Sequence, residues 1–199
     1  MFYSRRIYPQ LLSHSQSPAV TVLTGMRRTG KTTLIQQILK DLANKNSVYM
    51  DLQRPDNREL FQQKNYEAIR QSFMAQGLTP DKTMVVALDE IQLAPDIPSA
   101  IKYLSDHHGI KFIVTGSSSY YLKNLFSESL SGRKKIFELY PLDFGEFLVF
   151  KEIPASQLDW RKGQFNKLEY NRLSSYYEEY VRFGGFPQVV LAKSETEKR

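Results

Sequence analysis

Residues Gly25 to Thr33 read GMRRTGKTT, which fits the pattern G-x-x-x-x-G-K-T of a phosphate-binding loop. The run Val20–Thr24 before it is apolar and typical of a β-strand, and the segment after it has the spacing of an amphipathic helix. Glycines let the backbone turn so that successive N–H groups face one anion, and the helix start adds its positive dipole end. The sequence therefore predicts a strand, a P-loop and a helix that together bind phosphate groups.

The residues of this loop are expected to make different contacts with a nucleotide. Lys31 can reach the β- and γ-phosphates, and the hydroxyl of Thr32 can ligate Mg²⁺. The four middle positions of the pattern are permissive, so solvated side chains at Arg27 and Arg28 are the alternative there. The predicted nucleotide contacts are Gly25, Arg27, Arg28, Thr29, Gly30, Lys31, Thr32 and Thr33.

A second motif follows the loop at the end of another apolar run. The residues from Met84 to Leu88 are apolar, and Asp89 and Glu90 come directly after them. Together with a P-loop, this arrangement matches a Walker B motif. Asp89 is predicted to hold Mg²⁺, which takes oxygen ligands, and Glu90 to orient and polarise the attacking water. The acidic pair argues against a small-molecule kinase, which must exclude water from the phosphoryl group.

Further catalytic candidates stand near two other strands. The run Phe112–Thr115 ends in a hydroxyl cluster, and a polar residue at such a strand tip can contact the γ-phosphate or the water. Thr115 is the first candidate for this sensor and Ser117 the second, while capping of the next helix is the alternative reading. Arg133 precedes the last predicted strand and could stabilise transition-state charge in cis or in a neighbouring subunit, while a surface or structural ion-pair arginine is the alternative. Arg182 is a weaker candidate.

Apolar runs alternate with helical patterns along the chain, which is typical of a parallel α/β sheet. The predicted strands are Val20–Thr24, Ser47–Asp51, Met84–Asp89, Phe112–Thr115 and Lys135–Leu139. The predicted helices are Lys31–Asn44, Glu59–Ala75, Ile97–His107, Tyr120–Phe126 and Asp143–Phe150. Because the pattern changes near Pro141, we expect an ATPase core over residues 1–140, with a lead-in at 1–18. Residues 141–199 are expected to form a small helical lid that is truncated.

The composition limits the class of protein. The 199 residues carry a formal net charge of +6 and no cysteine, and the isoelectric point is about 9.4. The absence of cysteine excludes a disulfide framework and a thiolate metal site, and the three histidines have no metal-ligand spacing. No apolar run approaches the length of a membrane span, so we expect a soluble, cytoplasmic protein. The basic balance is compatible with DNA without requiring it.

The series of motifs resembles one protein family. GMRRTGKTT, LDEIQ, TGSSS, LSGR, YPLDFGEF and FGGFP follow one another in the order found in bacterial and archaeal AAA-like ATPases of the ASCE group. The resemblance covers nearly all of the chain. It implies a five-stranded sheet of order 5-1-4-3-2, with ATP and Mg²⁺ bound at Lys31, Thr32, Asp89 and Glu90. It also places Arg133 on the family's S-G-R arginine.

The resemblance also bears on partners and on function. Members are usually about twice this length and carry a C-terminal nuclease-like domain, so such a domain is expected as a missing effector. The leading hypothesis is Mg²⁺-dependent ATP binding and slow hydrolysis. The alternatives are a nucleotide-gated signalling switch with negligible turnover and a DNA-dependent motor or loader. A homo-oligomer is a candidate partner, and a ring would need an arginine such as Arg133 acting in trans.

Overall fold

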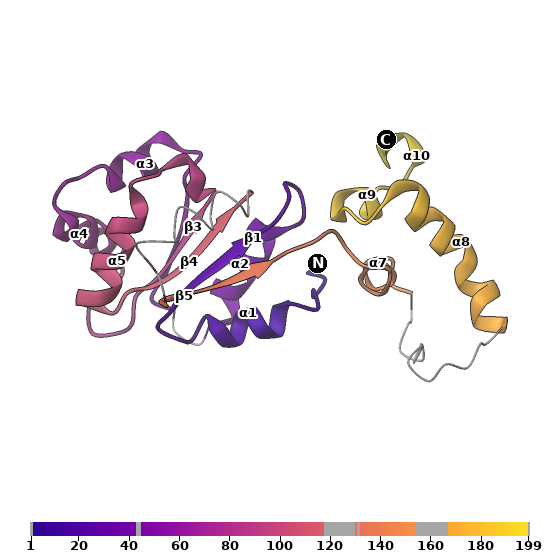
Figure 1. Cartoon of the computed structure of the whole chain (residues 1–199), viewed down its shortest axis with the longest axis horizontal. Helices are drawn as coiled ribbons and strands as arrows, with labels where there is room; N and C mark the ends of the chain where they lie inside the picture. Colours follow the sequence, from indigo (N-terminus) through magenta and orange to yellow (C-terminus); the bar gives the residue numbers. More distant parts are fainter. Residues whose placement is uncertain (1, 43–44, 118–129, 131, 154–166, 199) are drawn as a thin grey trace. The chain divides into compact units, whose positions relative to one another are not determined.

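The computed structural model describes residues 2–42, 45–117, 130, 132–153 and 167–198. Its centre is a parallel sheet of five strands in the order β2-β3-β4-β1-β5, which confirms the expected α/β fold and strand order (Figure 1). The strands are β1 (Val20–Thr24), β2 (Ser47–Asp51), β3 (Val85–Asp89), β4 (Lys111–Gly116) and β5 (Lys134–Glu138). The predicted strand ends differ from these bounds by at most one residue.

The register of the strands brings the candidate motifs to one edge of the sheet. In β1 and β4, Leu23 pairs with Thr115, and in β2 and β3, Asp51 pairs with Asp89. All these pairs are parallel, so the carboxyl ends of the strands meet at the same edge. β1, β3 and β4 are buried along their whole length, as expected for central strands that are covered on both faces.

Helices cover the two faces of this sheet. One face packs against α3 (Pro55–Phe61), α4 (Tyr66–Ala75) and α5 (Ile97–His108) in the main hydrophobic core. On the other face lie α1 (Tyr8–His14) and α2 (Lys31–Asp41), as Figure 1 shows. A short 3₁₀ helix, η1 (Ile91–Leu93), follows β3 directly. No helix in the described part of the chain is both long enough and apolar enough to cross a membrane.

The prediction of a single helix over Glu59–Ala75 is wrong, because two helices, α3 and α4, lie in this region. α3 ends at Phe61, and α4 begins after Asn65, whose side chain accepts a hydrogen bond from Glu67 N at 3.0 Å. Asparagine at this position caps a helix start by satisfying a free backbone N–H group, so the sequence ends one helix and begins another. The helix expected over Tyr120–Phe126 lies outside the described residues.

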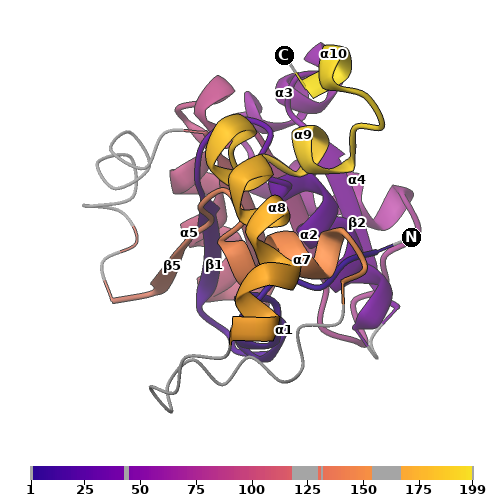
Figure 2. The same ribbon diagram turned by 90° about the vertical axis from the view of Figure 1, so that its right-hand side faces the viewer.

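The chain divides into two compact units, residues 7–139 and residues 1–6 with 140–199. The second unit contains α7 (Phe144–Phe150), α8 (Lys167–Phe183), α9 (Pro187–Leu191) and α10 (Glu195–Lys198), which Figure 2 shows from the side. Within it, the buried guanidinium of Arg5 pairs with Glu146 at 2.9 Å. Asp143 and Glu146 form a reciprocal capping box at the start of α7. Residues 2–6 thus belong to the same compact unit as the C-terminal helices.

Candidate nucleotide-binding site

The loop between β1 and α2 has the backbone geometry that its glycines predict. Gly25 has a φ of 148°, and a Cβ atom built on it would lie 2.2 Å from the carbonyl oxygen of Leu139. Gly30, which precedes the first residue of α2, has a φ of 98°. Both values lie in the region that favours glycine. The loop therefore leads directly into the amino terminus of α2, where backbone N–H groups and the helix dipole attract anions.

Lys31 is folded into this loop. Its Nζ atom donates to the carbonyl oxygens of Gly25 and Met26, each at 2.9 Å. Its side chain is almost fully buried, and burial lowers the pKa of this amine, while the nearby carboxylates of Glu90 and Asp89 oppose the shift. The ammonium group is therefore held at the mouth of the loop, where it can meet phosphate oxygens.

The carboxylate of Asp89 is the centre of the hydrogen-bond network. Thr32 Oγ1 donates to Asp89 Oδ2 at 2.6 Å, and Tyr49 OH donates to the same oxygen at 2.9 Å. The hydroxyl of Thr115 donates to Asp89 Oδ1. Asp89 is only 3% exposed, so these three donors compensate a charge that would otherwise be costly to bury. The structure thus brings the two expected Mg²⁺ ligands, Thr32 and Asp89, into direct contact.

Thr115 supports the acidic pair from the neighbouring strand. Its hydroxyl donates to Asp89, and the same oxygen accepts a hydrogen bond from Glu90 N at 3.2 Å. The side chain is fully buried. The two contacts of Thr115 with Asp89 and Glu90 hold the end of β3 in place, and its contact with the γ-phosphate or the water stays a prediction. Ser117, the second sensor candidate, lies two residues further along and is only partly buried.

Two residues of this network were missed by sequence reasoning. Tyr49 lies on β2 and reaches Asp89 only because β2 pairs with β3, and no local pattern signals this contact. Gln92 donates from Nε2 to Glu90 Oε2 at 2.5 Å and to Ser117 Oγ at 3.1 Å. It is the last letter of the stretch LDEIQ, so its position in that motif was the available signal.

The remaining loop residues have different surroundings. Arg27 and Arg28 are exposed, and Arg28 has a φ of 65°. Thr29 is buried and donates to the carbonyl oxygen of Met26 at 2.8 Å, so it braces the loop from inside. Thr33 is exposed on the first turn of α2. The side chains of Arg27 and Arg28 are therefore accessible to a ligand, whereas the side chain of Thr29 is buried and stabilises the loop.

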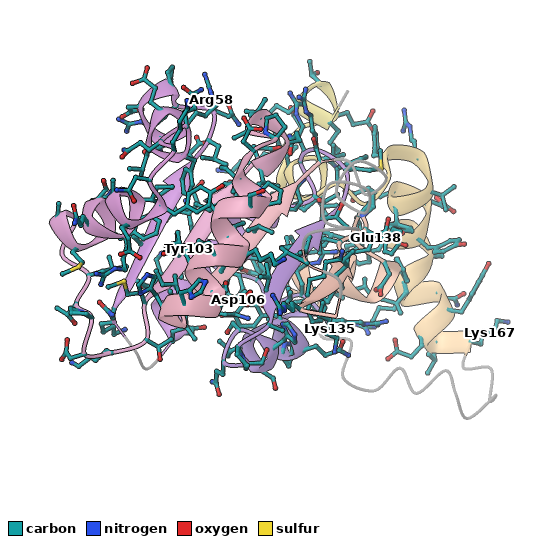
Figure 3. All side chains as sticks on the ribbon, turned by 60° about the vertical axis from the view of Figure 1, so that its left-hand side comes forward. Arg58, Tyr103, Asp106, Lys135, Glu138 and Lys167 are labelled. Carbon is teal, nitrogen blue, oxygen red and sulfur yellow. The ribbon has the colours of Figure 1, made fainter. Side chains whose placement is uncertain are left out.

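Arg133 does not lie at this site. Its carbonyl oxygen accepts a hydrogen bond from Val20 N at 2.8 Å, at the start of β1, and its guanidinium pairs with Asp106 at the end of α5. In Figure 3, Asp106 of α5 and Lys135 of β5 lie in the lower part of the view, and Glu138, the last residue of β5, lies above them. A strand of five residues separates the two edges of the sheet by about 16 Å. Arg133 therefore lies at the edge of the sheet opposite the P-loop of its own chain.

Arg182 and the histidines make contacts within their own surroundings. Arg182, in the C-terminal unit, forms an exposed pair with Glu195 at 3.2 Å. His14 contacts Thr21, and His108 contacts Glu67. No group of three or more histidines, cysteines or acidic residues that could hold a metal ion occurs in the described ranges.

The donor set at the P-loop nevertheless suits Mg²⁺. It offers one hydroxyl and one carboxylate, from Thr32 and Asp89, and Mg²⁺ in nucleotide sites is commonly bound by one or two protein oxygens together with phosphates and water. Two buried oxygen atoms find no hydrogen-bond partner among the described residues, Thr24 Oγ1 and Gln92 Oε1. Thr24 is the last residue of β1, and Gln92 lies in η1 after β3. Each therefore has an oxygen at the carboxyl edge of the sheet that can still accept a hydrogen bond.

A family model described as an AAA domain matches residues 17–148, which is about two thirds of the chain. The chain belongs to the AAA domain family. The match spans the P-loop, the acidic pair and all five strands. The AAA domain therefore includes every residue of the network around Asp89.

Relatives of this AAA domain occur in archaea and bacteria. The uncharacterized protein MJ1544 of Methanocaldococcus jannaschii is 29% identical over 180 residues, which cover 90% of this chain and 38% of that protein. An uncharacterized protein of Haemophilus influenzae is 26% identical over 188 residues, which cover 92% of this chain and 43% of that protein. The chain thus spans less than half the length of these curated relatives.

Solved structures share the fold of the AAA domain. The Walker-type ATPase of Pyrococcus abyssi matches with a TM-score of 0.59 and 19% identity, over 96% of this chain and 66% of that one. PCH-2 of C. elegans matches with a TM-score of 0.62 and 14% identity, over 98% and 64%. The ORC1 protein of Aeropyrum pernix, solved in complex with DNA, matches with a TM-score of 0.57 and 15% identity, over 94% and 56%. Identities this low establish the fold alone.

Proposed function

We propose that this chain binds Mg²⁺ and ATP at the P-loop and hydrolyses ATP slowly to ADP and phosphate. The observation that carries the proposal is the 2.6 Å hydrogen bond from Thr32 Oγ1 to Asp89 Oδ2. A loop hydroxyl and a strand-end carboxylate, 57 residues apart in sequence, meet at one point. Both are ligands that Mg²⁺ prefers, and the buried ammonium group of Lys31 lies on the same loop.

Each residue has a chemical part in the proposed reaction. Hydrolysis forms a bond between a water oxygen and the γ-phosphorus and breaks the bond from that phosphorus to the bridging oxygen of ADP. Glu90 would orient the water and accept its proton, and Lys31 would balance charge on the β- and γ-phosphates. Mg²⁺, when bound, supplies further neutralisation of the phosphate oxygens. Adenine as the base rests on the family, whose structural neighbours include a Walker-type ATPase.

The proposal is tested by measuring ATP affinity and phosphate release in three variants. Lys31→Ala should weaken ATP binding by about 100-fold or more, because it removes the buried cation that faces the phosphates. Glu90→Gln should keep ATP affinity within a few-fold and lower turnover by about 10²- to 10⁴-fold, the range of a general base. Lys40→Ala, at an exposed position of the same helix, is the matched control and should change neither quantity.

Two outcomes would contradict the assignment. ATP affinity that survives Lys31→Ala unchanged would show that the nucleotide binds elsewhere. Turnover that persists in Glu90→Gln at the wild-type rate would show that another group activates the water.

We further propose that Arg133 acts in trans, on the nucleotide site of a neighbouring copy. Its position at the amino edge of the sheet, beside Val20, keeps it away from the P-loop of its own chain. Its guanidinium is half exposed, and its partner there is Asp106. An arginine that stabilises transition-state charge across a subunit interface contributes about 10³- to 10⁵-fold in related phosphoryl transfers. This role requires a homo-oligomer.

Mixing two inactive variants tests the role in trans. Arg133→Ala retains a complete P-loop, and Lys31→Ala retains the arginine, so a mixed oligomer contains some complete sites. We expect the mixture to hydrolyse ATP at least several-fold faster than either variant alone, and wild-type turnover to rise more than linearly with protein concentration. Arg172→Ala, which removes a partly exposed arginine of the C-terminal unit, is the control and should match the wild type. Full activity of Arg133→Ala alone would contradict the proposal.

Two alternatives remain and make different predictions. A nucleotide-gated switch would retain ATP with negligible single-turnover hydrolysis. A DNA-dependent motor or loader is suggested by the net charge of +6 and by the complex of ORC1 with DNA. In that case DNA should raise the ATPase rate, and salt should weaken the effect steeply. A C-terminal effector domain is a further proposal, to be tested on a protein of the relatives' full length.

A further inference from the structure

One side-chain amide connects the ends of two neighbouring strands at the candidate site. Gln92 Nε2 donates to Glu90 Oε2 at 2.5 Å and to Ser117 Oγ at 3.1 Å. Glu90 directly follows β3, and Ser117 directly follows β4, which pairs with β3. The amide nitrogen must face Glu90, because a carboxylate accepts hydrogen bonds and the amide oxygen cannot donate one.

The backbone of Glu90, like its carboxylate, is fixed by contacts with neighbouring residues. Glu90 has a φ of 57°, in the left-handed region that non-glycine residues seldom adopt. The N–H group of Glu90 donates to Thr115 Oγ1 at 3.2 Å, and Ile91, fully buried in the main core, anchors the 3₁₀ turn that carries Gln92. Strained conformations of this kind persist where surrounding contacts determine them, and they cluster at functional sites.

We infer that Gln92 is a positioning residue for Glu90, and that it couples the Glu90 carboxylate to Ser117 at the tip of β4. The inference rests on the proposed ATP hydrolysis. The hydrogen bond from Gln92 engages Oε2 of Glu90, which directs the other carboxylate oxygen to the proton of the attacking water. Gln92 Oε1 is buried and accepts no hydrogen bond from the residues that the structure describes. The same amide therefore has an acceptor available for a second polar group, such as a water.

The expected signature is a fall in kcat without a change in KM. Gln92→Met has a side chain of similar length without N–H donors, so it removes the contact and leaves little empty space. Because a hydrogen bond to a charged group is lost, kcat should fall about 10- to 100-fold, while KM and the ATP dissociation constant stay within about 2-fold. Gln92→Ala should behave in the same way. Gln71→Met, at an exposed position on α4, is the matched control and should match the wild type.

A double-mutant cycle separates positioning from a general structural effect. If Gln92 acts through Glu90, adding Gln92→Met to Glu90→Gln should change the residual single-turnover rate by less than about 2-fold. Ser117→Ala should lower kcat by a smaller factor, and its effect should also not add to that of Gln92→Met. Melting temperatures and ATP affinities of all variants show that the fold is intact.

The outcomes distinguish this inference from the proposed function. Wild-type kcat in Gln92→Met, a faster rate in that variant, or fully additive effects with Glu90→Gln would overturn the positioning role while ATP hydrolysis stands. A rise in KM without a fall in kcat would also overturn it. A wild-type chain that binds ATP but shows no hydrolysis in a single turnover would overturn both.

Discussion

At the scale of single residues, the acidic group at the end of β3 depends on donors from three other elements. Asp89 accepts hydrogen bonds from Thr32 on α2, Tyr49 on β2 and Thr115 on β4. Burial raises the pKa of Tyr49, and the negative charge of Asp89 adds to this, so the phenol remains a donor. Three donors from separate elements therefore fix the position of this buried carboxylate.

Gly25 gives a prediction at this scale. Gly25→Ala should strongly reduce ATP binding and lower the melting temperature, because the new methyl group would collide with the carbonyl oxygen of Leu139 at 2.2 Å. Gly77→Ala is the matched control, since Gly77 also has a positive φ, of 96°, but no atom within 4 Å of the added carbon. The control should cost about 1 kcal/mol through backbone strain alone. Equal melting temperatures for the two variants would show that the loop yields to the methyl group.

At the scale of elements, the connection between α1 and β1 is attached to the first residue of β4. Lys111 is 3% exposed, and its Nζ donates to the carbonyl oxygens of His14, at 3.2 Å, and of Ala19. Burial lowers the pKa of Lys111 to about 8. An ammonium group in this position satisfies two carbonyl groups of the α1–β1 connection at the amino edge of the sheet, opposite the P-loop.

This buried amine predicts a pH dependence of stability. The folded pKa of about 8 lies below the unfolded value of about 10.5, so the unfolded chain holds more protons between these values, and stability rises with pH across that window. From pH 7 to pH 9.5, the Lys111 contribution to the free energy of unfolding should rise by about 2 kcal/mol. Lys111→Met should lack this rise in denaturant titrations at both pH values, whereas Lys102→Met on α5 should keep it. A rise that persists in Lys111→Met must come from other groups.

At the scale of the whole molecule, the chain forms two compact units. The second unit has its own hydrophobic cluster, which includes Leu142, Phe147 and Leu173. The start of the chain is held to this unit by Arg5, which donates to both carboxylate oxygens of Glu146, at 2.9 and 3.0 Å, and to the carbonyl oxygen of Tyr140. Burial raises the pKa of Glu146, but the hydrogen bonds and charge of Arg5 outweigh it, so the net pKa is lowered. The contacts of Arg5 with Glu146 and Tyr140 thus close the unit, in the sense that they join the start of the chain to the segment after residue 139.

Two adjacent arginines allow a matched test of this closure. Arg5→Met should destabilise the second unit by about 3–5 kcal/mol, because it leaves the carboxylate of Glu146 buried without its partner. Arg6→Met, which breaks an exposed pair with Asp143, should cost less than about 1 kcal/mol. Limited proteolysis and calorimetry would follow the second unit separately from the sheet. Equal costs for the two variants would mean that Arg5 does not close the unit.

The sequence alone determined the P-loop, the acidic pair and the five strands, because each depends on the residues of one short segment. A run of apolar residues followed by glycines and a helix start is a local pattern, and its geometry follows from backbone preferences. The strand order came from the family resemblance. The break at Asn65 was missed, although the cap is also local, because residues 62–65 contain no glycine or proline that would mark the end of a helix.

Only the tertiary structure decided which side chains meet Asp89 and Glu90. Tyr49 and Thr115 reach Asp89 through the pairing of three strands, and Gln92 reaches Ser117 because β3 and β4 are neighbours. Arg133 has the sequence context of a catalytic arginine, yet the parallel pairing of β5 with β1 puts it at the far edge of the sheet. Contacts of this kind depend on strand register and on which elements are adjacent in space, and neither property is encoded within one segment.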